Sequence, residues 1–186
     1  DSIRAAKYPK AVELDGLTAE LTKGILACLN CPTGEGHDNA LNGIIVQFDL
    51  TFSQKAWVEL QRYHFMDFVS SCSTMHKLQN MNPRLQCNRY VDHRAIDILQ
   101  EKIDHYNWLV ATNKKPEYNI NPDEIKEARL EMLYNIPSGF ELTAAMTTNY
   151  RQLKTIYQQR RHHALTDWQV FCDFCETLPR FLELTQ

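Results

Sequence analysis

Hydrophobic residues recur every three or four positions along much of the chain, which predicts a protein built mainly of amphipathic helices. The repeat is clearest over residues 94–111 and also marks residues 17–30 and 54–68. In these three segments the positions that share an apolar face are Ile96, Leu99, Ile103, Tyr106 and Val110; Leu17, Leu21, Ile25 and Leu29; and Trp57, Leu60, Gln61, His64 and Phe68. We expect three helices here, the last of them capped by Ser53.

Two further helix starts and two strands complete the predicted elements. Asn121 followed by Pro122 and two acidic residues is typical of a helix N-terminus. The sequence Thr166-Asp167-Trp168-Gln169 has the form of a capping box that opens a last helix. Residues 43–52 and 140–147 are rich in strand formers, and residues 32–37 and 70–74 have the composition of loops. The predicted fold is α+β: a helix-rich single domain over residues 1–186 with a small antiparallel sheet.

One stripe near the C-terminus combines apolar and polar positions. Asn149, Leu153, Ile156 and Arg160 fall at i, i+4, i+7 and i+11, so on a helix they lie on one face. A face that begins with an amide and ends in a guanidinium directs two polar groups towards the interior. Because arginine is rarely buried without a partner, we expect a planar, acceptor-rich group to meet Arg160. The stripe therefore indicates a binding site.

Composition and charge limit the classes of partner. With 186 residues, 44% hydrophobic and 23% charged, the chain is typical of a globular domain. A net charge of -3 argues against binding a nucleic-acid backbone, which favours a basic face. No apolar run is long enough for a membrane span, and the N-terminal residues lack the apolar core of a signal peptide. The expected location is the cytoplasm.

The six cysteines include two CxxC pairs, Cys28–Cys31 and Cys172–Cys175. Two such pairs have the ligands for one tetrahedral zinc ion. The second pair lies in an aromatic-rich helical segment, where cysteine behaves as a small hydrophobic residue. We therefore expect buried free thiols and no metal, and keep a zinc-stapled structural domain as an alternative.

A second polar cluster, Arg62-Tyr63-His64, precedes a run of hydroxyl side chains. Cationic side chains beside hydroxyls and free backbone N–H groups suit a phosphate. The guanidinium fork of Arg160 suits the imide edge of a uracil or flavin ring. Each residue also has an ordinary interpretation: Arg62 as a solvated surface residue, His64 as a core histidine, and the serines as a plain loop.

Taken together, these blocks resemble the flavin-dependent thymidylate synthases. Gly36-His37 and the strand after it are similar to the family's entry to its first strand, and Arg62-Tyr63-His64 falls on its Arg-His-Arg motif. The segment 137–160 matches the family's second signature in register, including Thr147, Asn149, Arg151, Leu153 and Arg160; Ala164 and Trp168 follow, shifted by one residue. The resemblance covers roughly residues 36–75 and 128–175, and the second signature is its specific part.

The resemblance implies a role for each matching residue. Arg160 would polarise the uracil ring and act in catalysis. The flavin cofactor, FAD, would be contacted by Asn39, Arg62, Tyr63, His64, Asn149, Tyr150, Arg151 and Thr155. The nucleotide and its phosphate would be bound by Glu59, Arg62, Ser70, Ser71, Ser73, Arg129 and Arg160.

The chain departs from the family pattern mainly where the phosphate is bound. His64 replaces an arginine of the first motif. The family's phosphate-binding clamp, Ser-Gly-Arg, becomes Cys72-Ser73-Thr74 in strict register, and Ser71 and Ser73 take the place of its serine only if the alignment is shifted slightly. Arg129 stands one helical turn further from Pro137 than the family pattern. Each lost charge-assisted bond weakens binding by about 1.5–3 kcal/mol. The clamp is therefore weakened unless other arginines, namely Arg84, Arg89 or Arg94, replace the lost groups.

The implied function is reductive methylation of a uracil nucleotide, from dUMP to dTMP, with FAD, NADPH and methylenetetrahydrofolate. Family members are homotetramers whose active sites combine several subunits, so the resemblance also implies a homotetramer. Two alternatives remain open: a divergent paralogue that modifies another pyrimidine nucleotide, for example by hydroxymethylation, and a non-catalytic flavin- or nucleotide-binding protein.

Overall fold

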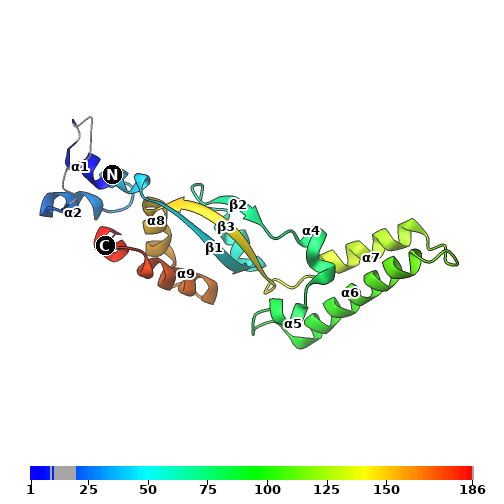
Figure 1. Ribbon diagram of the computed structural model, residues 1–186. Coiled ribbons are helices and arrows are strands. Elements are labelled where there is room, and N and C mark those ends of the chain that lie inside the picture. The colour runs from blue at the N-terminus through cyan, green and yellow to red at the C-terminus, as the bar shows by residue number, and fades with distance from the viewer. Residues whose placement is uncertain (9, 11–19, 186) are drawn as a thin grey trace. The chain divides into compact units, whose positions relative to one another are not determined.

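The computed structural model describes residues 1–8, 10 and 20–185, and the chain divides into two compact units (Figure 1). Unit 1 comprises residues 1–49, 60–69 and 145–186, and unit 2 comprises residues 50–59 and 70–144. Each unit is described by itself. The prediction of a single domain over residues 1–186 stays a prediction.

The described strands form one antiparallel sheet in the order β1-β3-β2. Their bounds are β1 (Ile45–Ser53), β2 (Asp67–Ser71) and β3 (Glu141–Asn149). The central strand, β3, runs without a break into the next helix, because Asn149 ends the strand and caps that helix. This continuity fixes the start of the predicted polar-tipped stripe at the end of the sheet's middle strand.

The helices of unit 1 surround an aromatic core. They are α1 (Ser2–Lys7), α2 (Lys23–Leu29), the 3-10 helix η1 (Asn39–Gly43), α8 (Tyr150–Arg160), α9 (Thr166–Thr177) and α10 (Phe181–Thr185). Trp168 and Phe171 of α9 are almost fully buried and pack edge to face, with ring centroids 5.9 Å apart. Tyr150 and Phe181 make a similar contact at 5.5 Å. The Tyr150–Phe181 ring contact joins α8 to α10, and α9 packs against both of these helices.

Unit 2 is dominated by a helical hairpin. Its helices are α3 (Gln54–Leu60, whose last residue belongs to unit 1), α4 (Thr74–Lys77), the 3-10 helix η2 (Leu78–Asn80), α5 (Pro83–Gln86), α6 (His93–Asn113) and α7 (Pro122–Tyr134). The two long helices α6 and α7 lie side by side (Figure 1). Their buried faces meet around Leu99, Ile103 and Met132, which pack with Leu78 and Phe140.

Most of the predicted elements are confirmed. The helix expected over residues 94–111 is α6, with Ile96, Leu99 and Ile103 buried as its periodicity requires. Asn121 caps α7 by accepting a hydrogen bond from the Asp123 N–H, and both expected strands are present. The helix-rich α+β class with a small antiparallel sheet is confirmed.

The helix predicted to run from Ser53 through Phe68 is wrong in its second half. Ser53 accepts the expected bond from the Ala56 N–H, but α3 ends at Leu60. Phe68 belongs to β2, which continues through Ser70 and Ser71, so the loop expected from Ser70 is also wrong there. All five β2 residues are exposed. A strand without a buried face lacks the alternation of apolar and polar residues that indicates a strand. The apolar residues here happen to follow a helical spacing, which led to the wrong prediction.

Two other helix ends differ from expectation. Leu165, not Thr166, is the N-cap of α9, and no side-chain cap is made there, so the predicted capping box does not form. The helix predicted over residues 17–30 is observed only as α2, capped by Thr22. The part of that prediction that falls on residues 17–19 lies outside the described residues. No helix within the described ranges is long and apolar enough to cross a membrane.

Candidate functional site

The candidate site is built on α8, which follows β3 directly. The Asn149 side chain accepts a hydrogen bond from the Gln152 N–H at 2.9 Å and so caps the helix. Leu153 and Ile156 are fully buried on the face below this cap. Arg160 ends the same face with only 8% of its surface exposed. The predicted stripe is therefore confirmed as a buried face, although Asn149 caps the helix instead of forming its first turn.

Arg160 is held by two aromatic rings of its own unit. Its guanidinium carbon lies 4.9 Å from the centre of the Trp168 ring and 5.7 Å from that of Tyr63. Its Nε donates to the Tyr63 hydroxyl at 2.9 Å. The Tyr63 hydroxyl in turn donates to the Gln159 side chain at 3.0 Å. A cation placed against two ring faces and one hydroxyl is fixed in orientation, which suits a group that must recognise a planar partner.

The rest of the Arg62-Tyr63-His64 cluster is open to solvent. Arg62 and His64 are exposed on the turn that follows α3, and Tyr63 is half-buried between them. The structure thus separates the three residues by role: Tyr63 supports Arg160, while the two flanking basic side chains remain accessible. They are available to an anionic group at the surface of unit 1.

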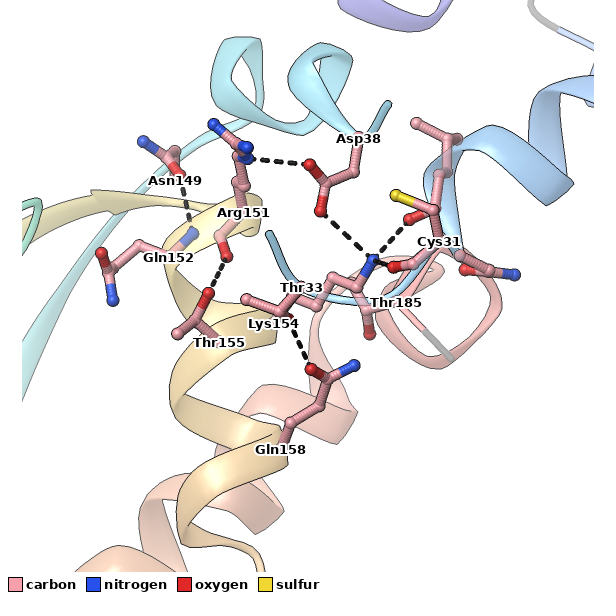
Figure 2. Close-up of polar contacts among 12 residues, drawn as sticks. Cys31, Thr33, Asp38, Asn149, Arg151, Gln152, Lys154, Thr155, Gln158 and Thr185 are labelled. Atoms are coloured by element: carbon pink, nitrogen blue, oxygen red, sulfur yellow. Dashed lines mark hydrogen bonds and ion pairs between the residues drawn. The ribbon is translucent and has the colours of Figure 1, made fainter. Parts of the chain in front are cut away.

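A second face of α8 binds the loop that precedes η1 (Figure 2). Arg151 Nε donates to Asp38 Oδ1 at 2.8 Å. The Lys154 ammonium is fully buried and donates to the Leu29 and Cys31 carbonyl oxygens at 2.8 and 2.6 Å. It also lies 3.3 Å from Asp38 Oδ2, so the one carboxylate is shared between two cations.

The other residues predicted to contact the flavin differ in accessibility. Asn39 is exposed at the start of η1, next in sequence to Asp38. Thr155 is half-buried and donates to the Arg151 carbonyl oxygen at 3.2 Å. Tyr150 is 3% exposed and donates to the Pro179 carbonyl oxygen at 2.8 Å, so its side chain belongs to the core of unit 1. The flavin contacts of these residues stay predictions.

The residues predicted to bind the nucleotide phosphate lie in unit 2, apart from Arg62 and Arg160. Ser70 and Ser71 are exposed at the end of β2, and Ser73 is the N-cap residue of α4. Glu59 on α3 pairs with Lys55, with Nζ and Oε1 3.6 Å apart. Their joint part in a phosphate site stays a prediction.

Arg129 of α7 uses its Nη2 to donate to the Met75 carbonyl oxygen at 2.7 Å. It therefore ties α7 to α4, immediately after Ser73. The arginines considered as replacements for the clamp have other partners: Arg94 pairs with Asp92, Arg84 with Asp97, and Arg89 bonds the Tyr90 hydroxyl. The structure gives none of the three a role beside the serines.

The six cysteines are free, and their environments differ. Cys28 is exposed, whereas Cys31, Cys172 and Cys175 are buried. Burial raises the pKa of Cys172 to about 11 and also raises the pKa of Cys175. Among the described residues, no three His, Cys, Asp or Glu side chains gather as metal ligands. The second CxxC pair thus lies where a neutral thiol is stable, as predicted for buried free cysteines.

A pocket of about 290 Å³ opens in unit 1 beside η1. Lys7, Thr22, Cys28 and His37 supply its polar lining. None of the residues predicted to bind FAD or nucleotide is among those that line it. It is therefore separate from the Arg160 set.

Two features of the site were missed by sequence analysis. Lys154 and Asp38 are 116 positions apart, and no local spacing links them. A weak signal does exist, since Tyr150, Lys154 and Tyr157 follow a helical repeat of i, i+4 and i+7 that places Lys154 between two aromatic residues. Trp168 falls near the family pattern, shifted by one residue, but its contact with the Arg160 guanidinium follows only from the packing of α9 on α8.

Comparison with solved structures identifies the fold. Two crystal structures of the flavin-dependent thymidylate synthase ThyX from Helicobacter pylori, both with FAD and dUMP, superpose on this chain with a TM-score of 0.63. They cover 100% and 98% of this chain and 93% of their own, at 16% and 15% sequence identity. No protein-family model matches the chain, and no curated protein sequence is significantly similar to it. The chain has the thymidylate synthase ThyX fold over its full length.

Proposed function

We propose that this protein is a divergent flavin-dependent thymidylate synthase that binds FAD and a uracil nucleotide and methylates the uracil ring. The observation that carries the proposal is Arg160, a nearly buried guanidinium fixed by Tyr63 and Trp168 at the end of α8. It occurs in a chain with the fold of ThyX, whose structures contain FAD and dUMP. The aromatic support of Arg160 consists of contacts within this chain and does not depend on the likeness to ThyX.

The exposed side chains of unit 1 include the donor and cationic groups that FAD requires. A flavin dinucleotide presents imide carbonyls and a pyrophosphate, which call for N–H donors and cations. Exposed Arg62, His64 and Asn39 and the one-third exposed side chain of Arg151 supply such groups. These four would hold the cofactor, and bound FAD, once reduced by NADPH, would supply the hydride for the methyl transfer.

Arg160 would act on the nucleotide ring. A fixed cation beside the ring carbonyls stabilises the negative charge that develops when carbon 5 attacks the methylene donor. Tyr63 and Trp168 keep the guanidinium in place before the substrate arrives, so little reorganisation is needed during the reaction. No protein nucleophile is required by this scheme.

The remaining partners follow from the reaction type. NADPH would reduce the flavin, and methylenetetrahydrofolate would donate the carbon. The proposal also includes a homotetramer, with active sites built from several subunits, and a cytoplasmic location. The residues of unit 2 predicted to bind the nucleotide and its phosphate are Glu59, Ser70, Ser71, Ser73 and Arg129.

A product assay tests the proposal. Purified protein is reconstituted with FAD and incubated with NADPH, methylenetetrahydrofolate and dUMP, and dTMP is measured by chromatography. We expect dTMP to form only when all four small molecules are present, and its amount to exceed that of the protein. A protein that takes up FAD but yields no new nucleotide from dUMP would contradict the methyl transfer.

One observation favours a second candidate, a paralogue that acts on another pyrimidine nucleotide. The clamp arginine of the family is absent, and Arg129 is bonded to a backbone carbonyl oxygen. A site with fewer cations accepts a different phosphate or sugar arrangement. The same assay with dCMP, UMP and deoxyuridine, analysed for methylated and hydroxymethylated products, separates the two candidates.

A further inference from the structure

Lys154 is the most deeply buried cation among the described residues, with its side chain 0% exposed. An ammonium group has three N–H donors. The structure provides three acceptors: the Leu29 and Cys31 carbonyl oxygens at 2.8 and 2.6 Å, and Asp38 Oδ2 at 3.3 Å. A buried charge is costly unless it is paired and hydrogen-bonded, so this full set of partners marks a built feature of the fold.

The three acceptors of Lys154 all belong to the segment that precedes η1. Leu29 is the last residue of α2, and its carbonyl is among those left without a partner at a helix C-terminus. Cys31 begins the loop, and Asp38 ends it as the N-cap residue of η1. Gly34 and Gly36 in between have φ angles of 105° and 81°, which other residues rarely adopt. One side chain of α8 thus closes both ends of this loop.

The end of this loop, Asp38, lies beside two of the predicted flavin contacts, Asn39 of η1 and Arg151 of α8. Asp38 Oδ1 accepts from Arg151 Nε at 2.8 Å, and Asn39 follows Asp38 directly. The negative charge of Asp38 is shared between Lys154 and Arg151, so it only partly neutralises the positive charge of Arg151. Arg151 keeps about a third of its side chain exposed in this arrangement. Figure 2 shows the Lys154, Asp38 and Arg151 side chains meeting between α8 and the loop.

We propose that Lys154 is a positioning residue for the flavin site: its three bonds lock residues 29–38 onto α8, and this lock holds Asn39 and Arg151 in a fixed relation. The inference rests on the proposed FAD binding, and Lys154 itself touches no ligand. It distinguishes Lys154 from Gln158, one turn further along α8, which accepts a bond from the exposed Thr33 at 2.6 Å without any buried charge.

The test compares Lys154→Met, Lys154→Arg and a control, Thr33→Val, which removes the exposed loop bond. FAD affinity is measured by quenching of flavin fluorescence, and amide hydrogen exchange of residues 29–43 is measured without FAD. We expect Lys154→Met to exchange these amides faster, because its bonds to the loop are lost, and to bind FAD about tenfold more weakly, because binding must then order the loop. Lys154→Arg should recover part of both effects, and Thr33→Val should stay within about twofold of wild type.

Several results would overturn the inference. A folded Lys154→Met variant with wild-type FAD affinity makes the lysine purely structural, even if its unfolding temperature falls. If that variant does not fold, Asp38→Asn with Lys154→Met, which leaves no buried charge unpaired, is held to the same criterion. If neither folds, rapid exchange of residues 29–38 in the wild-type protein contradicts the lock. Wild-type protein that binds no FAD overturns the proposed function instead, while the exchange data still report on the lock.

Discussion

The residues predicted for the flavin and the ring, and those predicted for the phosphate, lie in different structural settings. In unit 1, Arg160 and Arg151 are bonded to Tyr63 and Asp38, and each pair joins elements far apart in sequence. In unit 2, Ser70 and Ser71 are exposed on a strand with no buried residue. Preorganised groups hold a ligand more tightly than groups that must be ordered on binding. If the proposed function holds, the ring-binding residues are therefore already positioned, and the phosphate-binding residues become ordered only when the nucleotide binds.

The largest effect on the proposed ring-binding residues is expected from the removal of the Arg160 side chain. In Arg160→Ala the cation proposed to polarise the uracil ring is lost, and we expect the rate of dTMP formation to fall by about 10²-fold or more, the scale for loss of one transition-state donor. FAD should remain bound, because the predicted cofactor contacts are other residues. Turnover and retained flavin absorbance are measured on the same sample.

Arg161→Ala is the matched control for that variant. Arg161 is the next residue, but it pairs with Asp173 and Glu176 at distances of 2.6 and 3.0 Å. Its loss should leave turnover within about threefold of wild type, as expected for a surface ion pair. Full activity in Arg160→Ala would remove the central role given to this residue.

A smaller effect is expected from Tyr63→Phe. The ring remains against Arg160 and Trp168, but the hydroxyl that accepts from Arg160 Nε is lost. One such bond contributes about 1 kcal/mol, so kcat should fall roughly fivefold with little change in FAD affinity. Steady-state kinetics and flavin titration measure the two quantities. A variant that loses FAD and keeps kcat would show that Tyr63 serves the cofactor instead.

Alkaline pH should weaken unit 1 through its buried thiols. Burial raises the pKa of Cys172 from 9.0 to about 11, so as pH rises the unfolded thiol loses its proton first. This contribution to stability is complete below pH 9 and is lost between about pH 9 and 11. We expect the unfolding temperature to fall by a few degrees over that range, and by less in Cys172→Ala. A Cys172→Ala variant with the same pH dependence as wild type would assign the fall to other groups.

The smallest effect is expected in unit 2. Arg129→Ala removes the bond to the Met75 carbonyl oxygen that fixes the start of α4 near Ser73. We expect dUMP affinity to fall about threefold, the value of a partly exposed hydrogen bond. Arg94→Ala is the control, since the described contacts of the Arg94 side chain are with Asp92, two residues before it. If dUMP affinity fell a hundredfold in Arg129→Ala, the residues predicted to bind the phosphate would be as well positioned before binding as those predicted to bind the ring.

The sequence predicted the long helices and the central strand because their signals are local. Residues 94–111 repeat with helical spacing, and Asn121 with Pro122 marks a helix start without reference to the rest of the chain. The end of α3 was missed because β2 has no buried face, and a strand of this kind is specified by pairing with β3. Such pairing depends on partners distant in sequence, which no local pattern reports.

The site divides in the same way. The stripe that ends in Arg160 was visible because all its members lie on one helix. Its aromatic support was not, since Tyr63 lies 97 residues from Arg160 and reaches it only in the folded chain. Lys154 and Asp38 were missed for the same reason. Candidate site residues that lie on one helix can be predicted from their spacing in the sequence. The residues that hold them in place are distant in sequence, so they are identified only from the contacts in the structure.

The most direct test of the account is a titration of FAD-loaded wild-type protein with dUMP, followed by the absorbance of the bound flavin. If α8 holds the flavin near its start and the uracil ring at Arg160, we predict that FAD stays with the protein on gel filtration. Addition of dUMP should then change the flavin spectrum to saturation, and Arg160→Ala should abolish that change. A protein that retains no FAD, or a flavin spectrum that dUMP leaves unaltered, would contradict it.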